Sequence, residues 1–326
     1  MNDKRSFASV SLLAVLIMLG ACAAPSPWQA EHYRDHPLVG RIWISAEARF
    51  IERAELIAAL APAAFILLGE THDNPDHHLL QGEIVTALAA TGRRPLLAFE
   101  MLDMTQGEAL GKHLAQSPND AAGIGEAVGW GESGWPDWAI YQPVAEAGLR
   151  AGLELRAVSM RRSEARALAQ SGIKGAAAER IEGLQLDRPL PEAEEEKLRS
   201  AIDAAHCGYA VEETIDAMAF AQFARDAHMA RELSSAGADG AILIAGNGHA
   251  RNDRAVPFHL ARFAPDRSVA SLAFLEVLEG EEEAPAYAAS FDGELLPFDY
   301  VWFTPRVDIR DACGRFEEQL KKMRKE

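Results

Sequence analysis

Four side chains able to do acid–base or metal chemistry follow apolar runs that are predicted to be β-strands. They are Glu70, His72, Glu100 and His249. Glu70 and His72 are two residues apart, so in an extended segment their side chains project to the same side. Open parallel sheets bind their ligands at the carboxyl ends of the strands. We therefore expect the four side chains to meet in one crevice.

Two imidazoles and two carboxylates in one crevice can act in three ways. They can hold zinc, manganese or iron, since His nitrogen and Glu oxygen are ligands of these metals. They can catalyse acid–base hydrolysis, in which a crowded carboxylate pair raises one pKa. They can also orient a bound cofactor, and each one alone could be an ordinary helix cap. His77 and His78 lie close by in sequence, and we expect them in solvent or behind the crevice.

The crevice requires a parallel sheet, and the chain alternates apolar runs with helical patterns, as three-layer α/β/α proteins do. Seven runs are predicted to be strands, near residues 41–45, 64–68, 95–99, 153–158, 241–245, 269–274 and 299–303. Two of them, at 65–68 and 242–244, are continuously apolar. Such runs indicate central strands of a mainly parallel sheet, covered by helices on both faces.

A long interval from about residue 163 to residue 236 contains no strand pattern and many Ala, Glu and Leu residues. We predict a helical insertion that forms a cap over the strand ends. In its helix near residues 212–233, Gln222 and Asp226 fall within an apolar stripe. Because buried polar groups need partners, this face either meets the crevice or forms a structural network.

The composition excludes several classes of protein. Asp and Glu number 49 against 32 Lys and Arg, a net charge of −17, which argues against a nucleic-acid partner. The hydrophobic fraction of 48% with 25% charged residues is ordinary for a globular chain. The three cysteines form no Cys-x-x-Cys motif, so neither a zinc finger nor covalent haem attachment is expected.

The amino terminus is typical of an exported lipoprotein. Two basic residues precede an apolar run at 8–19, which is too short to span a bilayer and suits a signal peptide over residues 1–21. The run ends in Leu19-Gly20-Ala21-Cys22, which is similar to the lipobox of bacterial lipoproteins. The two alanines that follow predict an outer-membrane lipoprotein facing the periplasm of a Gram-negative bacterium. Acyl chains on Cys22 would be its anchor.

The rest of the chain is predicted to be one unit. We expect a tether over residues 22–36, a single α/β domain over 37–310 with the helical insertion, and a helical tail over 311–326. Because the periplasm is oxidising, Cys207 and Cys313 could form a disulfide, and two unpaired thiols are the alternative.

Five motifs in the same order resemble the ChaN family of haem-binding, iron-regulated lipoproteins. They are Leu68-Gly69-Glu70-x-His72-Asp73-Asn74-Pro75, Phe99-Glu100-Met101, His206-Cys207-Gly208, Gln222-x-x-x-Asp226-x-x-Met229-Ala230 and Gly246-Asn247-Gly248-His249-Ala250-Arg251. The resemblance runs from about Val39 to Pro257. It implies a three-layer α/β/α fold shared with erythromycin esterase-like, TraB and Tiki proteins.

The resemblance also implies noncovalent haem binding, across a dimer, with a tyrosine as iron ligand and a histidine assisting. We favour Tyr209, which follows His206 by three residues in the cap. Tyr141 is the second candidate, because the tryptophans near it could stack on a porphyrin. Arg251 and Arg161 lie just past strand ends, where they would offset the charge of the haem propionates in an acidic protein.

The sequence therefore predicts a lipid-anchored haem-binding protein of haem or iron acquisition. Its expected partners are haem, the membrane through Cys22, a second copy of the chain and an outer-membrane haem receptor. The alternative is a hydrolase of the erythromycin esterase or Tiki type, which would use Glu70, His72, Glu100 and His249 with or without a divalent metal. Residue types and spacing alone identify neither haem nor a reaction.

Overall fold

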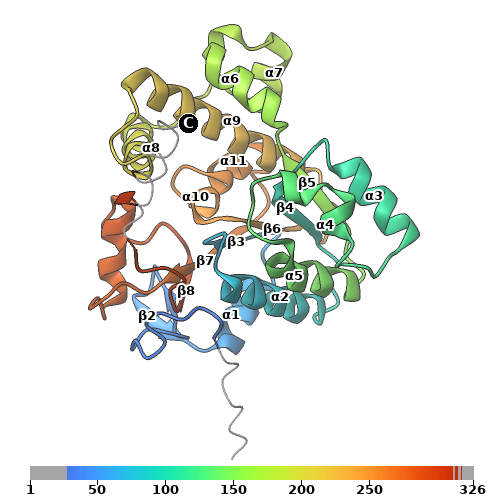
Figure 1. Ribbon diagram of the computed structural model, residues 1–326, viewed down its shortest axis with the longest axis vertical. Helices are drawn as coiled ribbons and strands as arrows, with labels where there is room; N and C mark the ends of the chain where they lie inside the picture. Colours follow the sequence, from blue (N-terminus) through green and yellow to red (C-terminus); the bar gives the residue numbers. More distant parts are fainter. Residues whose placement is uncertain (1–27, 311–312, 315–316, 318–326) are drawn as a thin grey trace, which may run out of the picture.

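The computed structural model describes residues 28–310, 313–314 and 317 (Figure 1). The predicted signal peptide, Cys22 and most of the predicted C-terminal tail lie outside the described residues. Within the described ranges, no helix is long and apolar enough to cross a membrane.

One eight-stranded sheet forms the centre of the molecule. Its strands are β1 (Ile42–Ile44), β2 (Arg49–Ile51), β3 (Phe65–Glu70), β4 (Leu96–Asp103), β5 (Leu155–Ser159), β6 (Ala241–Gly246), β7 (Val269–Glu276) and β8 (Tyr300–Thr304). They lie in the order β2-β1-β8-β7-β3-β6-β4-β5. The six strands from β8 to β5 pair in parallel, and β1 and β2 add an antiparallel edge.

The seven predicted strands are present, and β2 is the strand that the sequence analysis missed. It has three residues, and only Ile51 among them is buried. A strand that short carries no readable alternation of apolar and polar residues.

Helices cover both faces of the sheet because the side chains of its central strands alternate between them. Ile66 and Leu68 pack in one apolar cluster with α1 (Arg53–Leu60), α2 (Pro75–Ala89) and α5 (Trp138–Arg150). Phe65 and Leu67 pack in a second cluster with α9 (Glu212–Ser234) and α11 (Val256–Phe263). The predicted three-layer α/β/α fold is therefore confirmed.

The cap consists of helices only, as predicted for this interval. Between β5 and β6 the chain forms α6 (Arg162–Gly175), α7 (Ala178–Leu184), α8 (Glu192–Ala205) and α9, which stand together at the top of Figure 1. They share a third apolar cluster that includes Leu184, Leu198 and Phe223. Cys207, in the turn between α8 and α9, forms a disulfide with Cys313, with Cα atoms 5.5 Å apart.

Shorter elements complete the fold. They are α3 (Gly107–Gln116), α4 (Ile124–Ala127) and a 3₁₀ turn (Trp130–Glu132) between β4 and β5, α10 (Asn247–Ala250) after β6, and a 3₁₀ helix (Ala284–Phe291) before β8.

The described part of the predicted tether lies against the domain. The amides of Gln29 and Ala30 donate to the two carboxylate oxygens of Asp76 at 2.8 and 2.9 Å. Asp76 lies in the first turn of α2, so the incoming chain is fixed beside that helix. Any free tether is therefore shorter than the sequence suggested.

Candidate functional site

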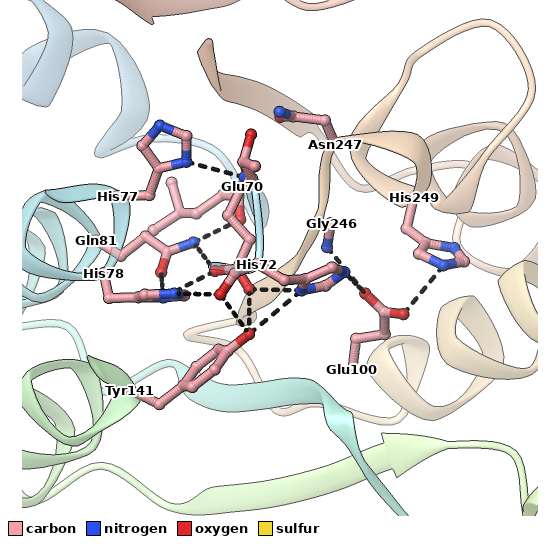
Figure 2. Close-up of polar contacts among 12 residues, drawn as sticks. Glu70, His72, His77, His78, Gln81, Glu100, Tyr141, Gly246, Asn247 and His249 are labelled. Atoms are coloured by element: carbon pink, nitrogen blue, oxygen red, sulfur yellow. Dashed lines mark hydrogen bonds and ion pairs between the residues drawn. The ribbon is translucent and has the colours of Figure 1, made fainter. Parts of the chain in front are cut away.

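The crevice lies where three neighbouring parallel strands end. Glu70 is the last residue of β3, Glu100 lies in the second half of β4, and Gly246 ends β6, which runs between them. β3 and β4 follow each other in the chain, but β6 lies between them in the sheet. An open parallel sheet forms a crevice at such a point, outside the carboxyl ends of its strands. Figure 2 shows the side chains of Glu70, His72, Glu100 and His249 gathered there, so the structure brings the four predicted residues together.

Four side-chain donors surround the buried carboxylate of Glu70. Its Oε1 accepts from Nδ1 of His72 at 3.0 Å and from the Tyr141 hydroxyl at 3.1 Å. Its Oε2 accepts from Nε2 of Gln81 at 2.7 Å and lies 3.1 Å from Nδ1 of His78. Burial alone would raise the pKa of Glu70, but His78 and His72 hold it well below its usual range. Glu70 is therefore an anion whose hydrogen-bonding capacity is filled.

His72 is held by one ring nitrogen and open at the other. Its Nδ1 donates to Glu70, because a carboxylate only accepts. Its Nε2 lies 3.9 Å from Oε2 of Glu100, which is beyond hydrogen-bonding distance. The indole of Trp135 contacts the ring at 4.6 Å between centroids, and the side chain is 31% exposed.

Gly246 makes room for His72. A Cβ atom at this position would lie 2.6 Å from Nε2 of His72, closer than real Cβ contacts come. A side chain at this position would therefore force the imidazole to move from its place over the end of β6. The amide of Gly246 donates to Oε2 of Glu100 at 2.8 Å, so the same residue also fixes that carboxylate.

A second buried chain of charges runs from Glu100 into the cap. Oε1 of Glu100 accepts from Arg225 at 2.9 Å and lies 3.1 Å from Nε2 of His249, while Nδ1 of His249 contacts Asp226. Both ring nitrogens of His249 thus face carboxylates. Burial would lower the pKa of His249, but Glu100 and Asp226 raise it to about 10, so His249 is an imidazolium.

Burial and neighbouring charges also shift the pKa values of His72, Glu100 and Asp226. Burial would lower the pKa of His72, but the hydrogen bond to Glu70 and the charge of Glu100 raise it above its ordinary value. Burial would raise the pKa of Glu100, but His249 leads the groups that hold it well below its usual range. Burial raises the pKa of Asp226, even though His249 opposes that rise.

His77 and His78 are both fully buried, so of the two places expected for them, in solvent or behind the crevice, the structure shows the second. The nitrogens of His78 contact three acceptors, namely Glu70, Gln81 and the carbonyl of His72, so both nitrogens donate. His77 instead accepts from the amide of Thr71. Burial accordingly lowers the pKa of His77 to about 3. Asn74 caps α2 at its first turn, where its side chain accepts from the amide of Asp76.

No bound divalent metal is supported. Within the part of the chain that the structure describes, no group of three or more His, Cys, Asp or Glu side chains could hold a metal ion. In this structure Nδ1 of His72 and both nitrogens of His249 face carboxylate oxygens instead. A metal ligand needs a free lone pair at those atoms.

A cavity of about 540 Å³ opens beside the crevice. Glu100 and Trp135 are part of its wall, so the cavity lies next to the exposed face of His72. Three arginines from the cap also line it, namely Arg162, Arg166 and Arg225. Sequence reasoning did not identify this cavity.

Of the residues predicted from the resemblance to bind haem, Tyr209 and His206 lie outside the crevice and Tyr141 lies within it. Tyr209 and His206 are in the turn between α8 and α9, where the Tyr209 hydroxyl donates to Glu317 at 2.7 Å and the side chain is 53% exposed. Tyr141 is fully buried beside Glu70 and packs on Trp130 and Trp138. That burial disfavours Tyr141 as a ligand to haem iron.

The two arginines predicted to meet the propionates are separated. Arg251 is 4% exposed and donates twice to Asp253 and once to the carbonyl of Phe291. Arg161 is exposed at the start of α6. A buried guanidinium that is already paired has little capacity for another anion.

Taken together, the crevice contains one accessible imidazole set between fixed anions. Tyr141, Gln81 and His78 on Glu70 and Arg225 on Glu100 hold those anions in place. Sequence reasoning did not identify Gln81 or Arg225, and it named Tyr141 only as a haem ligand. Asp226 had a sequence signal in its place in an apolar stripe, and His78 in its closeness to Glu70 along the chain. The geometry suits proton transfer at Nε2 of His72.

The comparisons with known proteins agree with this fold. A family model described as "Haem-binding uptake, Tiki superfamily, ChaN" matches residues 56–260. No curated protein matches the chain. A solved structure titled "Cofacial heme binding to ChaN of Campylobacter jejuni" superposes with a TM-score of 0.63 at 20% identity, over 80% of this chain and 95% of that chain. This likeness shows the fold. A solved structure of a mutant of the erythromycin esterase EreC in its open conformation superposes less well, with a TM-score of 0.41 at 13% identity, over 82% of this chain and all of that chain.

Proposed function

Since this chain belongs to the ChaN family of haem-binding uptake proteins, we propose that it binds haem noncovalently and serves haem or iron acquisition. The observation that carries this proposal is the family match over residues 56–260, which extends from α1 to α11. That range includes the whole cap and both halves of the crevice.

The cap offers chemistry that fits haem. A phenolate oxygen suits ferric iron, and the phenol of Tyr209 is exposed on the turn between α8 and α9. A cavity of about 390 Å³ lies among the cap helices, with mostly apolar walls that include Leu190, Leu198, Phe220 and Phe223. Apolar walls with a few polar groups are typical of sites for flat organic ligands. When bound, haem would supply the iron. Tyr209 and His206, which lie on the turn outside the lining of this cavity, would supply an oxygen ligand and a neighbouring imidazole.

A hemin titration of the purified protein tests this proposal. We expect a saturable shift of the Soret band at micromolar hemin, weakened and shifted in Tyr209→Phe. Tyr300→Phe is the matched control, because Tyr300 lies on β8, far from the cap in the fold, and should titrate like the wild type. Absence of a saturable shift in the wild type would overturn haem binding. Unchanged binding by Tyr209→Phe would overturn only the assignment of the ligand.

The same titration followed by light scattering tests for a homodimer. If haem is bound between two copies, the mass should double as hemin is added. A constant mass at saturation would show that one chain holds the haem alone.

We further propose that the protein is anchored to the periplasmic face of the outer membrane through Cys22, where an outer-membrane haem receptor is the expected partner. The lipobox-like sequence supports this proposal. Several acyl chains bind a membrane firmly, because each buried methylene adds about 0.8 kcal/mol. Cell fractionation should find the full-length protein with outer membranes and Cys22→Ala in the soluble fraction. Equal distributions of the two would contradict lipid anchoring.

A further inference from the structure

We propose that the cap also binds the phosphate group of a phosphomonoester, at the start of α6, between Arg161, Arg180 and His228. The proposal does not depend on haem binding. It rests on a cavity, on a buried histidine inside that cavity and on the positive charges around it. The lining of this cavity shares no residue with the cavity beside the crevice or with the apolar cavity of the cap.

The cavity has a volume of about 580 Å³ and lies where α6, α7 and α9 meet (Figure 1). Its lining comes from four segments of the chain. The residues are Met104 after β4, Arg161, Ser163 and Glu164 at the start of α6, Arg180 on α7 and His228 on α9. A ligand in this cavity therefore meets side chains from three helices at once.

His228 is a buried polar side chain that lacks a hydrogen-bond partner. It is 6% exposed, and neither ring nitrogen has a partner among the residues that the structure describes. Nearly all buried polar groups in proteins are hydrogen-bonded, because an unpaired one loses its hydration without compensation. An imidazole always carries at least one N–H, and His228 lines the cavity. A ligand that accepts this N–H would satisfy it.

The charges around His228 favour an anion as that ligand. Burial, Arg180 and Arg231 lower the pKa of His228 to about 4, so the ring is uncharged at neutral pH. The two guanidinium groups that oppose a proton on His228 would oppose any other cation at this place, and they would attract an anion.

The wall of the cavity is itself positive. It contains the guanidinium groups of Arg161 and Arg180 and one carboxylate, that of Glu164. Arg180 contacts Glu164, which holds it at the cavity, and Glu232 also lies near Arg180. Arg161 is exposed, and within the described ranges its guanidinium pairs with no carboxylate. It is therefore available to an anion.

The first turn of α6 adds backbone donors to this wall. The first amides of a helix have no carbonyl partner within it, and the positive end of the helix dipole lies beside them. Arg161 is the N-cap residue, and no side chain caps this end of α6. Because β5 ends at Ser159, the turn lies at the carboxyl edge of the sheet, where helix N-termini of α/β proteins bind phosphate.

A phosphate group fits these donors better than a carboxylate does. Guanidinium groups, an imidazole, the hydroxyl of Ser163 and helix amides approach from several directions. A carboxylate has two oxygens in one plane, whereas a phosphomonoester has three terminal oxygens and nearly two negative charges. The cavity is larger than a phosphate group alone, and Met104 makes part of its wall apolar, so there is room for the organic part of an ester.

Isothermal titration calorimetry with glycerol 3-phosphate, on protein free of hemin, tests the proposal. We expect saturable binding by the wild type, and a Kd raised about 10-fold or more in Arg161→Gln, because charge-assisted hydrogen bonds to phosphate are lost. Arg161 is exposed, so this substitution should leave the fold intact. Arg150→Gln, on α5 at the opposite face of the sheet, is the matched control and should bind like the wild type. No saturable binding by the wild type, or equal binding by Arg161→Gln, would overturn the proposal.

Two further ligands define the class. Succinate should bind about 10-fold more weakly than glycerol 3-phosphate or less, and equal affinities would overturn the choice of phosphate over carboxylate. Phosphatidic acid carries the same phosphomonoester on a lipid. Sedimentation with phosphatidic acid vesicles that Arg161→Gln abolishes would assign the site to a lipid head group, whereas glycerol 3-phosphate binding without such sedimentation would assign it to a soluble ester.

The pH dependence of sulfate binding tests the place of His228. The charged groups around His228 are Arg180 and Arg231, with Arg161, Glu164 and Glu232 farther along the same surface. A bound anion raises the pKa of His228, so the affinity for sulfate, which stays a dianion, should increase as pH falls below the ordinary histidine range. His228→Gln should lose this dependence, and an unchanged dependence would remove His228 from the site. Hemin titration of Arg161→Gln reports separately on the predicted contact with a haem propionate.

Discussion

Replacing His249 by Gln should flatten the pH dependence of stability on the alkaline side. Glu100 and Asp226 raise the pKa of His249 to about 10 in the folded protein, against 6.5 for an unperturbed histidine. Between those values the folded state holds one proton that the unfolded chain has lost. The stabilisation from this proton is complete below pH 6.5 and is lost as pH rises towards 10. Each pH unit in that window lowers the free energy of unfolding by about 1.4 kcal/mol.

Urea unfolding at several pH values between about 7.5 and 9.5 measures this loss. Over two pH units His249 should account for about 2.7 kcal/mol. The pKa values of His72 and His78 are also raised, so the wild-type slope includes their contribution in the same direction. The difference in slope between wild type and His249→Gln isolates His249, and His113→Gln controls for loss of a histidine elsewhere. Parallel curves for wild type and His249→Gln would refute the assignment of a proton to this ring.

Three further predictions concern the crevice, the core and the cap. Gly246→Ala places a Cβ 2.6 Å from Nε2 of His72 and should lower the free energy of unfolding in urea by about 1–3 kcal/mol. Gly131→Ala, where a Cβ would meet nothing within 4 Å, should change it by less than about 0.5 kcal/mol. Equal effects of the two substitutions would contradict the close approach. His259→Leu should reduce acid sensitivity, because burial lowers the pKa of His259 to about 3 and the unfolded chain alone takes up this proton as pH falls below 6.5; an unchanged acid slope would count against it. Replacing both Cys207 and Cys313 by Ser should cost about 2–4 kcal/mol, since their disulfide closes a separation of 106 residues; unfolding curves that match under oxidising conditions would show that the disulfide does not form.

The central strands could be predicted from the sequence because their pattern of apolar residues is local. The run Phe65 to Leu68 is continuously apolar, and such a run indicates a strand buried on both faces. The edge strand Arg49–Ile51 was not readable, since its pairing with β1 depends on neighbours that the local pattern does not show. The meeting of Glu70, His72, Glu100 and His249 followed from the rule that parallel strands end on the same edge.

The supporting residues of the crevice were harder to predict. Tyr141 reaches Glu70 across 71 residues because α5 packs beside α2, and no short-range pattern encodes that contact. The sequence left His78 either in solvent or behind the crevice, and the packing of α2 on the sheet, which buries His78, decides between the two. Asp226 was the exception, since a carboxylate inside an apolar stripe signals a buried partner, and that partner is His249.

The most direct test of the central claim, that this chain binds haem, is native mass spectrometry of the purified protein mixed with hemin. The account predicts a new species heavier by a whole number of hemin masses, on one chain or on two, which persists through buffer exchange. Spectra that contain only the mass of the free chain at every hemin concentration would contradict it.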